Sequence, residues 1–128
     1  MNLLLDTHIA LWAITGDAKL GRSAGALIED TSNVVFVSAV SLFEIAIKRL
    51  RRPASLPITA SEALRLFEAA GYSVLPVSAS HGAAVESLPL LHADPFDRLL
   101  AAQAIVEPLR LITHDRKLAS YSDTFILA

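Results

Sequence analysis

Short apolar runs alternate with helical patterns along this chain, and that alternation restricts the fold more than any other feature. The apolar runs lie at residues 3–5, 34–37, 74–77 and 109–113, and a fifth is expected at 124–127. Nearly continuous apolar strands are typical of a parallel sheet covered on both faces. The sequence therefore predicts an α/β fold, a three-layer α/β/α sandwich with a central, mainly parallel sheet of about five strands.

Helical patterns fill the segments between the runs. They are expected at residues 8–15, 22–30, 41–52, 59–70, 79–88 and 95–106. Thr59 and Glu62 have the spacing of a capping box. Asp94 stands as a helix N-cap before Pro95, which suits the first helical position. Pro76 predicts that the third run is an edge strand or the end of a strand.

The chain has 128 residues, which fits a single domain over residues 1–128. It has no cysteine, which excludes disulfides and cysteine-ligated metal sites and is compatible with a cytoplasmic protein. The mean hydropathy of +0.49 is high, but Asp6 and Asp97 interrupt the runs that could otherwise form a membrane span or a signal peptide. Part of the apolar surface is therefore expected at an interface with a partner.

Four carboxylates follow the predicted strands or lie at the start of the next helix. Asp6 follows the first strand directly, and Asp115 follows the fourth strand by two residues. Glu44 and Asp97 lie in the first turns of two predicted helices. Because the carboxyl ends of parallel strands meet at one edge of the sheet, we expect the four side chains to converge there.

Carboxylates that share one cleft repel each other, by roughly 4 kcal/mol for two charges about 4 Å apart at an effective dielectric near 20. A multivalent cation would neutralise them, and Mg²⁺ and Mn²⁺ prefer oxygen ligands. Such ions orient and activate water and stabilise charge on a phosphodiester. The cluster therefore suggests phosphoryl chemistry, in which metal ions supply the positive charge that a net charge of −2 lacks.

Each acid also has a structural interpretation. Ser41 and Glu44 have capping-box spacing, and Asp97 in a first helical turn suits the helix dipole. Asp115 could start a turn or cap a short segment. Asp6 has no routine packing role directly after a buried strand. Joint placement at strand ends favours one site over four independent structural roles.

Neighbouring polar residues could support the acids. Thr113 and Asp115 have the period-2 spacing that lets them face the same way. Ser38 ends the second strand and Thr7 follows Asp6, and each could play a similar supporting role. Asp94 is an additional acid near the site, and its first interpretation is the N-cap.

Positive charge is concentrated at the end of the helix predicted over 41–52. This basic cluster consists of Lys48, Arg49, Arg51 and Arg52. It is either a solvated helix C-terminus, where cations suit the dipole, or a ridge that contacts RNA phosphates. Arg98 and Arg116 lie beside acids, and each could pair with its neighbour or bind phosphate.

The histidines and aromatic residues carry weaker signals. The four histidines do not form a ligand motif, so a zinc site is not expected. Trp12 is expected to pack in the core or at an interface. With aromatic residues at only 6%, a base-stacking platform is not indicated.

Four segments, in order, resemble the motifs of a PIN domain. They are residues 3–8 (LLLDTH), 38–46 (SAVSLFEIA), 92–104 (HADPFDRLLAAQA) and 111–115 (LITHD). Within this family the chain is similar to the toxin ribonucleases of VapBC toxin–antitoxin modules. The resemblance implies a PIN fold, dependence on Mg²⁺ or Mn²⁺, endonucleolytic RNA cleavage, homodimerisation and inhibition by a cognate antitoxin.

The resemblance also implies roles for the acids. Asp6, Glu44, Asp97 and Asp115 take the acidic positions of the family. Asp6 and Asp97 would hold the principal metal, while Glu44 and Asp115 would hold a second ion or position the attacking water. The expected product carries a 5′ phosphate.

Two other functions remain open from the residues alone. One is an Asp-based phosphotransfer or phosphatase domain with Asp6 as nucleophile. A haloacid-dehalogenase-like phosphatase would need an acid two residues later, where this chain has His8. The other is a non-catalytic interaction module, which would account for the apolar content but not for four acids at strand ends.

Overall fold

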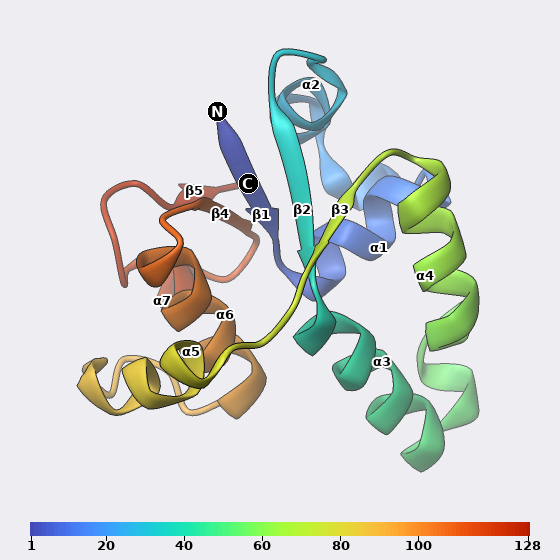
Figure 1. The fold of residues 1–128 in the computed structure, drawn as a ribbon. Helices are drawn as coiled ribbons and strands as arrows, with labels where there is room; N and C mark the ends of the chain where they lie inside the picture. The colour runs from blue at the N-terminus through green and yellow to red at the C-terminus, as the bar shows by residue number, and fades with distance from the viewer.

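A five-stranded sheet forms the centre of the computed structural model, which describes residues 1–128 (Figure 1). The strands are β1 (Asn2–Leu5), β2 (Val34–Ser38), β3 (Ser73–Leu75), β4 (Arg110–Thr113) and β5 (Ile126–Leu127). Their order is β3-β2-β1-β4-β5, and every neighbouring pair is parallel. In the central strand, Leu4 is paired with Phe36 of β2 and Leu111 of β4. The predicted α/β fold with a parallel central sheet is confirmed.

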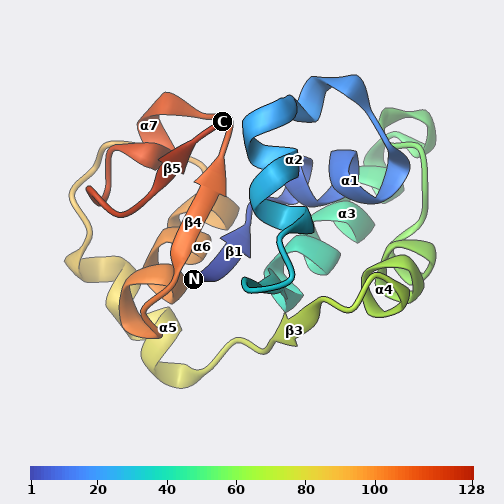
Figure 2. The ribbon, with the colours of Figure 1, turned by 90° about the horizontal axis from the view of Figure 1, so that it is seen from above.

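Helices cover both faces of this sheet. They are α1 (Thr7–Thr15), α2 (Arg22–Glu29), α3 (Ala39–Arg51), α4 (Ala60–Ala69), α5 (Ala79–Ala84), α6 (Pro95–Val106) and α7 (Arg116–Ala119). Seen from above, α1, α2 and α4 lie on one side of the sheet, and α5, α6 and α7 lie on the other (Figure 2). None of these helices is both long enough and apolar enough to cross a bilayer.

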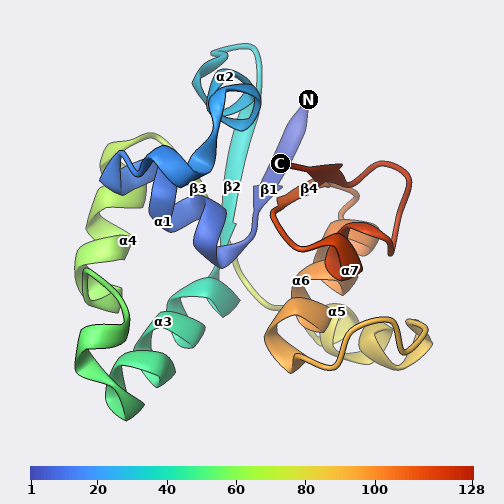
Figure 3. The same cartoon turned by 180° about the vertical axis from the view of Figure 1, so that it is seen from behind.

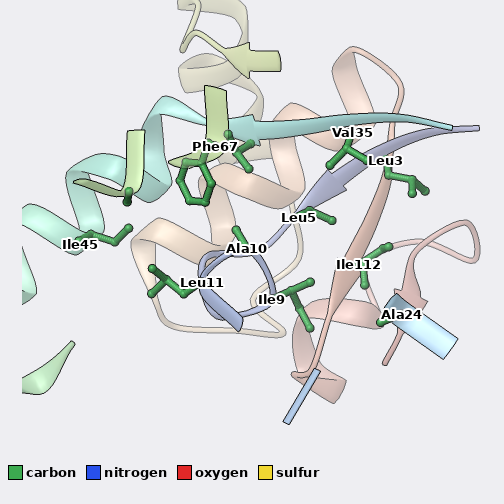
Figure 4. Close-up of a cluster of buried hydrophobic side chains, with 12 residues drawn as sticks. Leu3, Leu5, Ile9, Ala10, Leu11, Ala24, Val35, Ile45, Phe67 and Ile112 are labelled. Carbon is green, nitrogen blue, oxygen red and sulfur yellow. The ribbon is translucent and has the colours of Figure 1, made fainter. Parts of the chain in front are cut away.

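The alternation of side chains along β1 produces two cores. Leu3 and Leu5 point to one face, where they join Ile9 of α1 and Phe67 of α4 (Figure 4). Leu4 points to the opposite face and joins a second cluster with residues of α6 and α7. All three leucines are fully buried, and burying a leucine contributes roughly 1.5–3 kcal/mol. Burial on both faces explains why the run is apolar at every position.

Several local predictions are confirmed. Thr59 and Glu62 form the capping box of α4, and Asp94 caps α6 with Pro95 in its first turn. The proline after the third run also has the predicted effect, because β3 ends before it and lies at the edge of the sheet.

Other boundaries differ from the prediction. The helix predicted over 41–52 begins at Ala39, because the Ser38 hydroxyl accepts a hydrogen bond from the Val40 N–H at 3.0 Å and caps it. Ser41 therefore lies inside α3, and the capping box predicted for Ser41 and Glu44 is wrong. The helix predicted over 79–88 ends at Ala84 and continues as a short 3₁₀ turn.

Candidate active site

A cleft of about 610 Å³ collects the acids at the carboxyl edge of the sheet. At this edge α1 and α3 begin directly after β1 and β2 (Figures 1 and 3). The residues that line the cleft are Asp6, Thr7, His8, Trp12, Glu44, Lys48, His92, Asp94, Asp97, His114 and Asp115. The structure thus brings together the four acids proposed from sequence and a fifth, Asp94.

Asp6 is held by donors on two elements. It caps α1, where its Oδ1 accepts a hydrogen bond from the Ile9 N–H at 2.9 Å. Its Oδ2 accepts one from the Thr113 hydroxyl of β4. Burial raises the pKa of Asp6, while these two hydrogen bonds oppose that rise. The donors therefore stabilise a carboxylate that is only 7% exposed.

Thr113 connects Asp6 to the next acid along the edge. Its hydroxyl oxygen accepts a hydrogen bond from the Asp115 N–H at 3.0 Å. The Asp115 carboxylate in turn caps α7 and accepts hydrogen bonds from the backbone of Lys117 and Leu118. The predicted cap role of Asp115 is therefore present, and its side chain also lines the cleft.

Glu44 reaches the cleft from α3 and is 3% exposed. The Thr7 hydroxyl donates to its Oε1 at 2.7 Å and also lies 2.9 Å from the Ser41 hydroxyl. One helical turn later, the Lys48 ammonium forms an ion pair with Oε2. Lys48 is the only lysine or arginine among the lining residues, so the cleft as a whole stays strongly acidic.

Asp97 is placed where ionisation is unfavourable. It lies in the first turn of α6, whose N-cap Asp94 accepts hydrogen bonds from the N–H groups of Phe96 and Asp97. Burial, followed by the charges of Asp94 and Glu44, raises the pKa of Asp97 to about 7. Without a cation, about half of the Asp97 side chains therefore keep a proton at neutral pH.

His92 was not singled out as a site residue by the sequence prediction. Its Nδ1 accepts a hydrogen bond from the Asp94 N–H at 3.0 Å, so in the neutral ring the proton lies on Nε2. Nε2 is 2.8 Å from Asp115 Oδ2 and 3.2 Å from Asp97 Oδ2. Ligand atoms of these three residues lie within 4.8 Å of one another. His92 thus ties two of the acids together.

The hydrogen bond from His92 also decides the ionisation of Asp115. Partial burial works to raise the pKa of Asp115, but the His92 bond and the two backbone donors of α7 outweigh it and lower the pKa. The His92 Nε2–H is hydrogen-bonded to Asp115 and only lies near Asp97, and the pKa values of the two acids are displaced in opposite directions.

Two candidates from the sequence lie elsewhere. Ser38 is fully buried and donates to Gln103 Oε1 at 2.5 Å, which joins α3 to α6 away from the cleft. The Arg98 guanidinium donates to backbone carbonyls of residues 85–92 and to the Tyr121 hydroxyl. Arg98 pairs with no acid and does not line the cleft, so the expected ion pair is corrected: its guanidinium holds the loop that carries His92. A contact between Arg98 and phosphate stays a prediction.

The remaining basic candidates do not line the cleft. Arg49 donates to the Leu56 carbonyl at 2.6 Å. Arg51 and Arg52 are exposed at the end of α3, and Arg116 is exposed at the start of α7. These three are free to meet a ligand that extends beyond the cleft.

Comparison with known sequences gives two matches over most of the chain. The family model of the PIN domain matches residues 3–123. Ribonuclease VapC22 of Mycobacterium tuberculosis is 32% identical over 121 residues, which cover 94% of this chain and 92% of that protein.

Solved structures share the architecture. The structure of VapBC2 from Rickettsia felis, bound to a DNA fragment of its promoter, has a TM-score of 0.70 at 20% identity and covers 100% of this chain and 98% of that one. VapC20 of M. tuberculosis, described as a toxin that cleaves the sarcin–ricin loop, has a TM-score of 0.63 at 22% identity and covers 92% and 93%. At these identities the likeness concerns the fold.

Proposed function

Since the chain belongs to the PIN-domain family, as a member of the VapC type, we propose that it is a metal-dependent endoribonuclease and the toxin of a type II toxin–antitoxin pair. The observation that carries the proposal is the convergence of Asp6, Glu44, Asp97 and Asp115 in one cleft. The name of the relative VapC22, a ribonuclease, supports RNA as the substrate.

The donor set fits Mg²⁺ or Mn²⁺. Five carboxylates face one ammonium group in the cleft, and oxygen ligands are those that both ions prefer. Burial, followed by the charges of Asp94 and Glu44, raises the pKa of Asp97, and a bound cation would offset both effects. Asp6 and Asp97 would hold the principal ion, and Glu44 and Asp115 would hold a second ion or position water. A bound ion lowers the pKa of water and stabilises charge on the phosphate.

The side chains of this protein prepare the acids for that role. Thr113 orients Asp6, and Thr7 orients Glu44. His92 fixes the positions of Asp115 and Asp97. Because most of these donors are neutral, they orient carboxylates without cancelling the negative charge that attracts a divalent cation.

The proposed reaction is hydrolysis of a phosphodiester. A water oriented by Glu44 or Asp115 gives its proton to a carboxylate, and its oxygen bonds to phosphorus. The bond from phosphorus to the 3′ oxygen breaks, and that oxygen takes up a proton. The products are a 3′ hydroxyl and a 5′ phosphate.

Asp6 is a poor nucleophile for the alternative phosphotransfer function. Both of its carboxylate oxygens already accept hydrogen bonds, and the side chain is almost completely buried. The hydrogen bonds and the burial hold the carboxylate in place, so it has little freedom to move toward a phosphorus atom. This geometry suits a metal ligand better than a group that forms a phosphoester.

We also propose a cognate antitoxin and a homodimer as partners. Structures of similar fold include toxin–antitoxin complexes from Salmonella typhimurium and Klebsiella pneumoniae. Phe43 is 60% exposed beside an apolar hollow of about 410 Å³ between the starts of α3 and α6. Leu50 and Leu90 are also strongly exposed. These apolar surfaces support contacts with another protein chain.

The experiment is cleavage of total RNA by the purified, antitoxin-free chain, with sequencing of the product 5′ ends. Cuts at discrete positions that leave 5′ phosphates, and that vanish in Asp97→Asn, are expected. Products with 2′,3′-cyclic phosphates would contradict the hydrolytic mechanism. Absence of cutting by folded, metal-supplied protein would contradict the ribonuclease function.

A further inference from the structure

Aromatic rings form one wall of the acidic cleft and have no part in the hydrolysis described above. Trp12 lines the cleft together with His8 and His114. The ring centroids of His8 and Trp12 are 6.0 Å apart, and those of Trp12 and His114 are 5.3 Å apart with the rings nearly perpendicular. Both histidines are exposed, and Trp12 is half-buried. The sequence indicated a core or interface role for Trp12; the structure packs it against the core and also places it among the residues that line the cleft.

We propose that Trp12, with His8 and His114, forms a stacking subsite for an unpaired base of the RNA substrate. The proposal rests on the ribonuclease function above and names how substrate is held beside the acids. Unpaired bases are commonly bound on aromatic and histidine rings, because every base has a π face.

The position of the rings follows from the elements that carry the acids. Asp6 caps α1, and His8 and Trp12 lie four residues apart on that helix, where side chains share a face. His114 lies between Thr113, which binds Asp6, and Asp115. The ring wall therefore begins next to the proposed metal ligands, at the place where a nucleotide flanking the cut bond would lie.

The charge of the cleft explains why such a subsite is needed. Five carboxylates and one lysine line it, so phosphates of an approaching RNA meet mostly negative charge. Bound cations offset part of this repulsion, but they act on phosphate and not on the bases. Stacking adds affinity that does not depend on charge, and loss of one stacked base typically weakens binding about 5- to 150-fold.

Packing already orients the indole. Trp12 is packed against the core cluster that includes Leu3 and Ile9, and its ring also contacts the His114 ring, with 81° between the two ring planes. A ring held in place loses little conformational freedom when a base stacks on it, which favours binding.

The first test uses Trp12 as its own reporter, because it is the only tryptophan in the chain. The full-length Asp97→Asn protein is titrated with hexaadenylate RNA and with the same hexamer carrying abasic sites. Tryptophan fluorescence and the anisotropy of labelled RNA are followed in parallel. We expect hexaadenylate to quench the fluorescence with the Kd that anisotropy reports, and the abasic hexamer to bind more weakly with less quenching.

The second test compares variants in the same background. Trp12→Ala should raise the Kd for hexaadenylate about 5- to 150-fold, Trp12→Phe should restore most of the affinity, and His114→Ala should weaken binding a few-fold. Phe43→Ala removes an exposed aromatic ring outside the cleft and should leave the Kd unchanged. Because Trp12 touches the core, Trp12→Phe and His114→Ala keep the test valid if Trp12→Ala fails to fold.

Two results would overturn the subsite. One is RNA binding, seen by anisotropy, that leaves Trp12 fluorescence unaltered. The other is an unchanged Kd in folded Trp12 and His114 variants, which would also be the result if these rings contact a protein partner. If the parent protein binds no RNA at all, that result contradicts the proposed ribonuclease function and, with it, the subsite.

Discussion

Thr113 donates a hydrogen bond to Asp6 across 2.5 Å and so ties the end of β4 to the end of β1. The same hydroxyl oxygen accepts the backbone N–H of Asp115. One neutral side chain therefore sets the relative position of two acids on neighbouring strands. Because a hydroxyl adds no positive charge, the acids keep their attraction for a divalent cation.

Thr113→Val tests this connection. The variant keeps the shape of the side chain but removes the donor to Asp6 and the acceptor for Asp115. We expect metal affinity and RNA cleavage to fall about 10- to 100-fold, as is usual when a partner of a metal ligand is lost. Isothermal titration with Mn²⁺ would measure the loss of metal affinity, and single-turnover kinetics would measure the loss of cleavage rate. Thr113→Ser retains the hydroxyl, and equal losses in both variants would contradict the role of the hydrogen bond.

Asp97→Asn is expected to stabilise the metal-free protein above pH 7. The folded-state pKa of Asp97 is about 7, against 3.8 for the free group, so the folded protein holds a proton that the unfolded chain has lost. Between pH 3.8 and about pH 7 the free energy of unfolding therefore falls as pH rises, and the full loss is reached above pH 7. Melting temperatures of the parent and of Asp97→Asn are measured in EDTA from about pH 4 to pH 8. The excess of the variant's melting temperature over that of the parent should grow as pH rises.

Asp115→Asn is the control, because its effect on stability should depend on pH in the opposite direction. The pKa of Asp115 is lowered in the folded protein, so its carboxylate stabilises the fold above the ordinary pKa and loses that effect in acid. The variant should be less stable near neutrality and approach the parent as pH falls. A difference in melting temperature between variant and parent that stays constant with pH, for both variants, would contradict these ionisation states.

His92→Ala should weaken metal binding about 10- to 100-fold, because Asp115 loses its hydrogen-bond donor and Asp97 loses the ring that lies beside it. His92→Gln places an amide N–H where Nε2 lies and should recover part of the affinity. His81 offers a matched control, since its buried ring contacts Glu107 outside the cleft. If His81→Gln and His92→Gln impair Mn²⁺ binding equally, the effect of His92 is general destabilisation.

Arg98→Lys should lower stability by about 2–3 kcal/mol without changing how RNA binding depends on salt. The guanidinium serves several carbonyls that one ammonium cannot reach together. By contrast, replacing exposed Arg51 or Arg52 with Gln should reduce the salt slope of RNA affinity by about 1 if either contacts phosphate. A slope reduced by about 1 in folded Arg98→Gln, which removes the charge that lysine would keep, would restore the predicted role of Arg98 in RNA binding.

The sequence was sufficient for the sheet and for the convergence of the acids. Apolar runs located the strands, and Asp6 directly after a buried run marked the edge of the sheet where the acids meet, although the structure also makes Asp6 the N-cap of α1. The rule that parallel strands present their carboxyl ends together then placed Asp115 beside Asp6 without coordinates. Caps at Thr59 and Asp94 were predictable because they depend on residues within one helical turn.

Roles that depend on distant contacts were not predictable. His92 acts through Asp115, 23 residues later, and through a loop whose shape Arg98 fixes with backbone bonds. Ser38 was expected near the acids, but its partner Gln103 is 65 residues away and draws it into the interior. Composition argued against base stacking because it counts aromatic residues without locating them, whereas the fold gathers Trp12 and two histidines at one wall.

The metal-dependent cleavage of RNA is tested by the cleavage rate of the parent and of Asp97→Asn, measured in EDTA and in increasing Mg²⁺ or Mn²⁺. We expect no cutting in EDTA, a rate that rises and saturates with the cation, and no cutting by the variant at any concentration tested. Cleavage that persists in EDTA, or that Asp97→Asn retains in full, would contradict the assignment of the acidic cleft as a metal-dependent ribonuclease site.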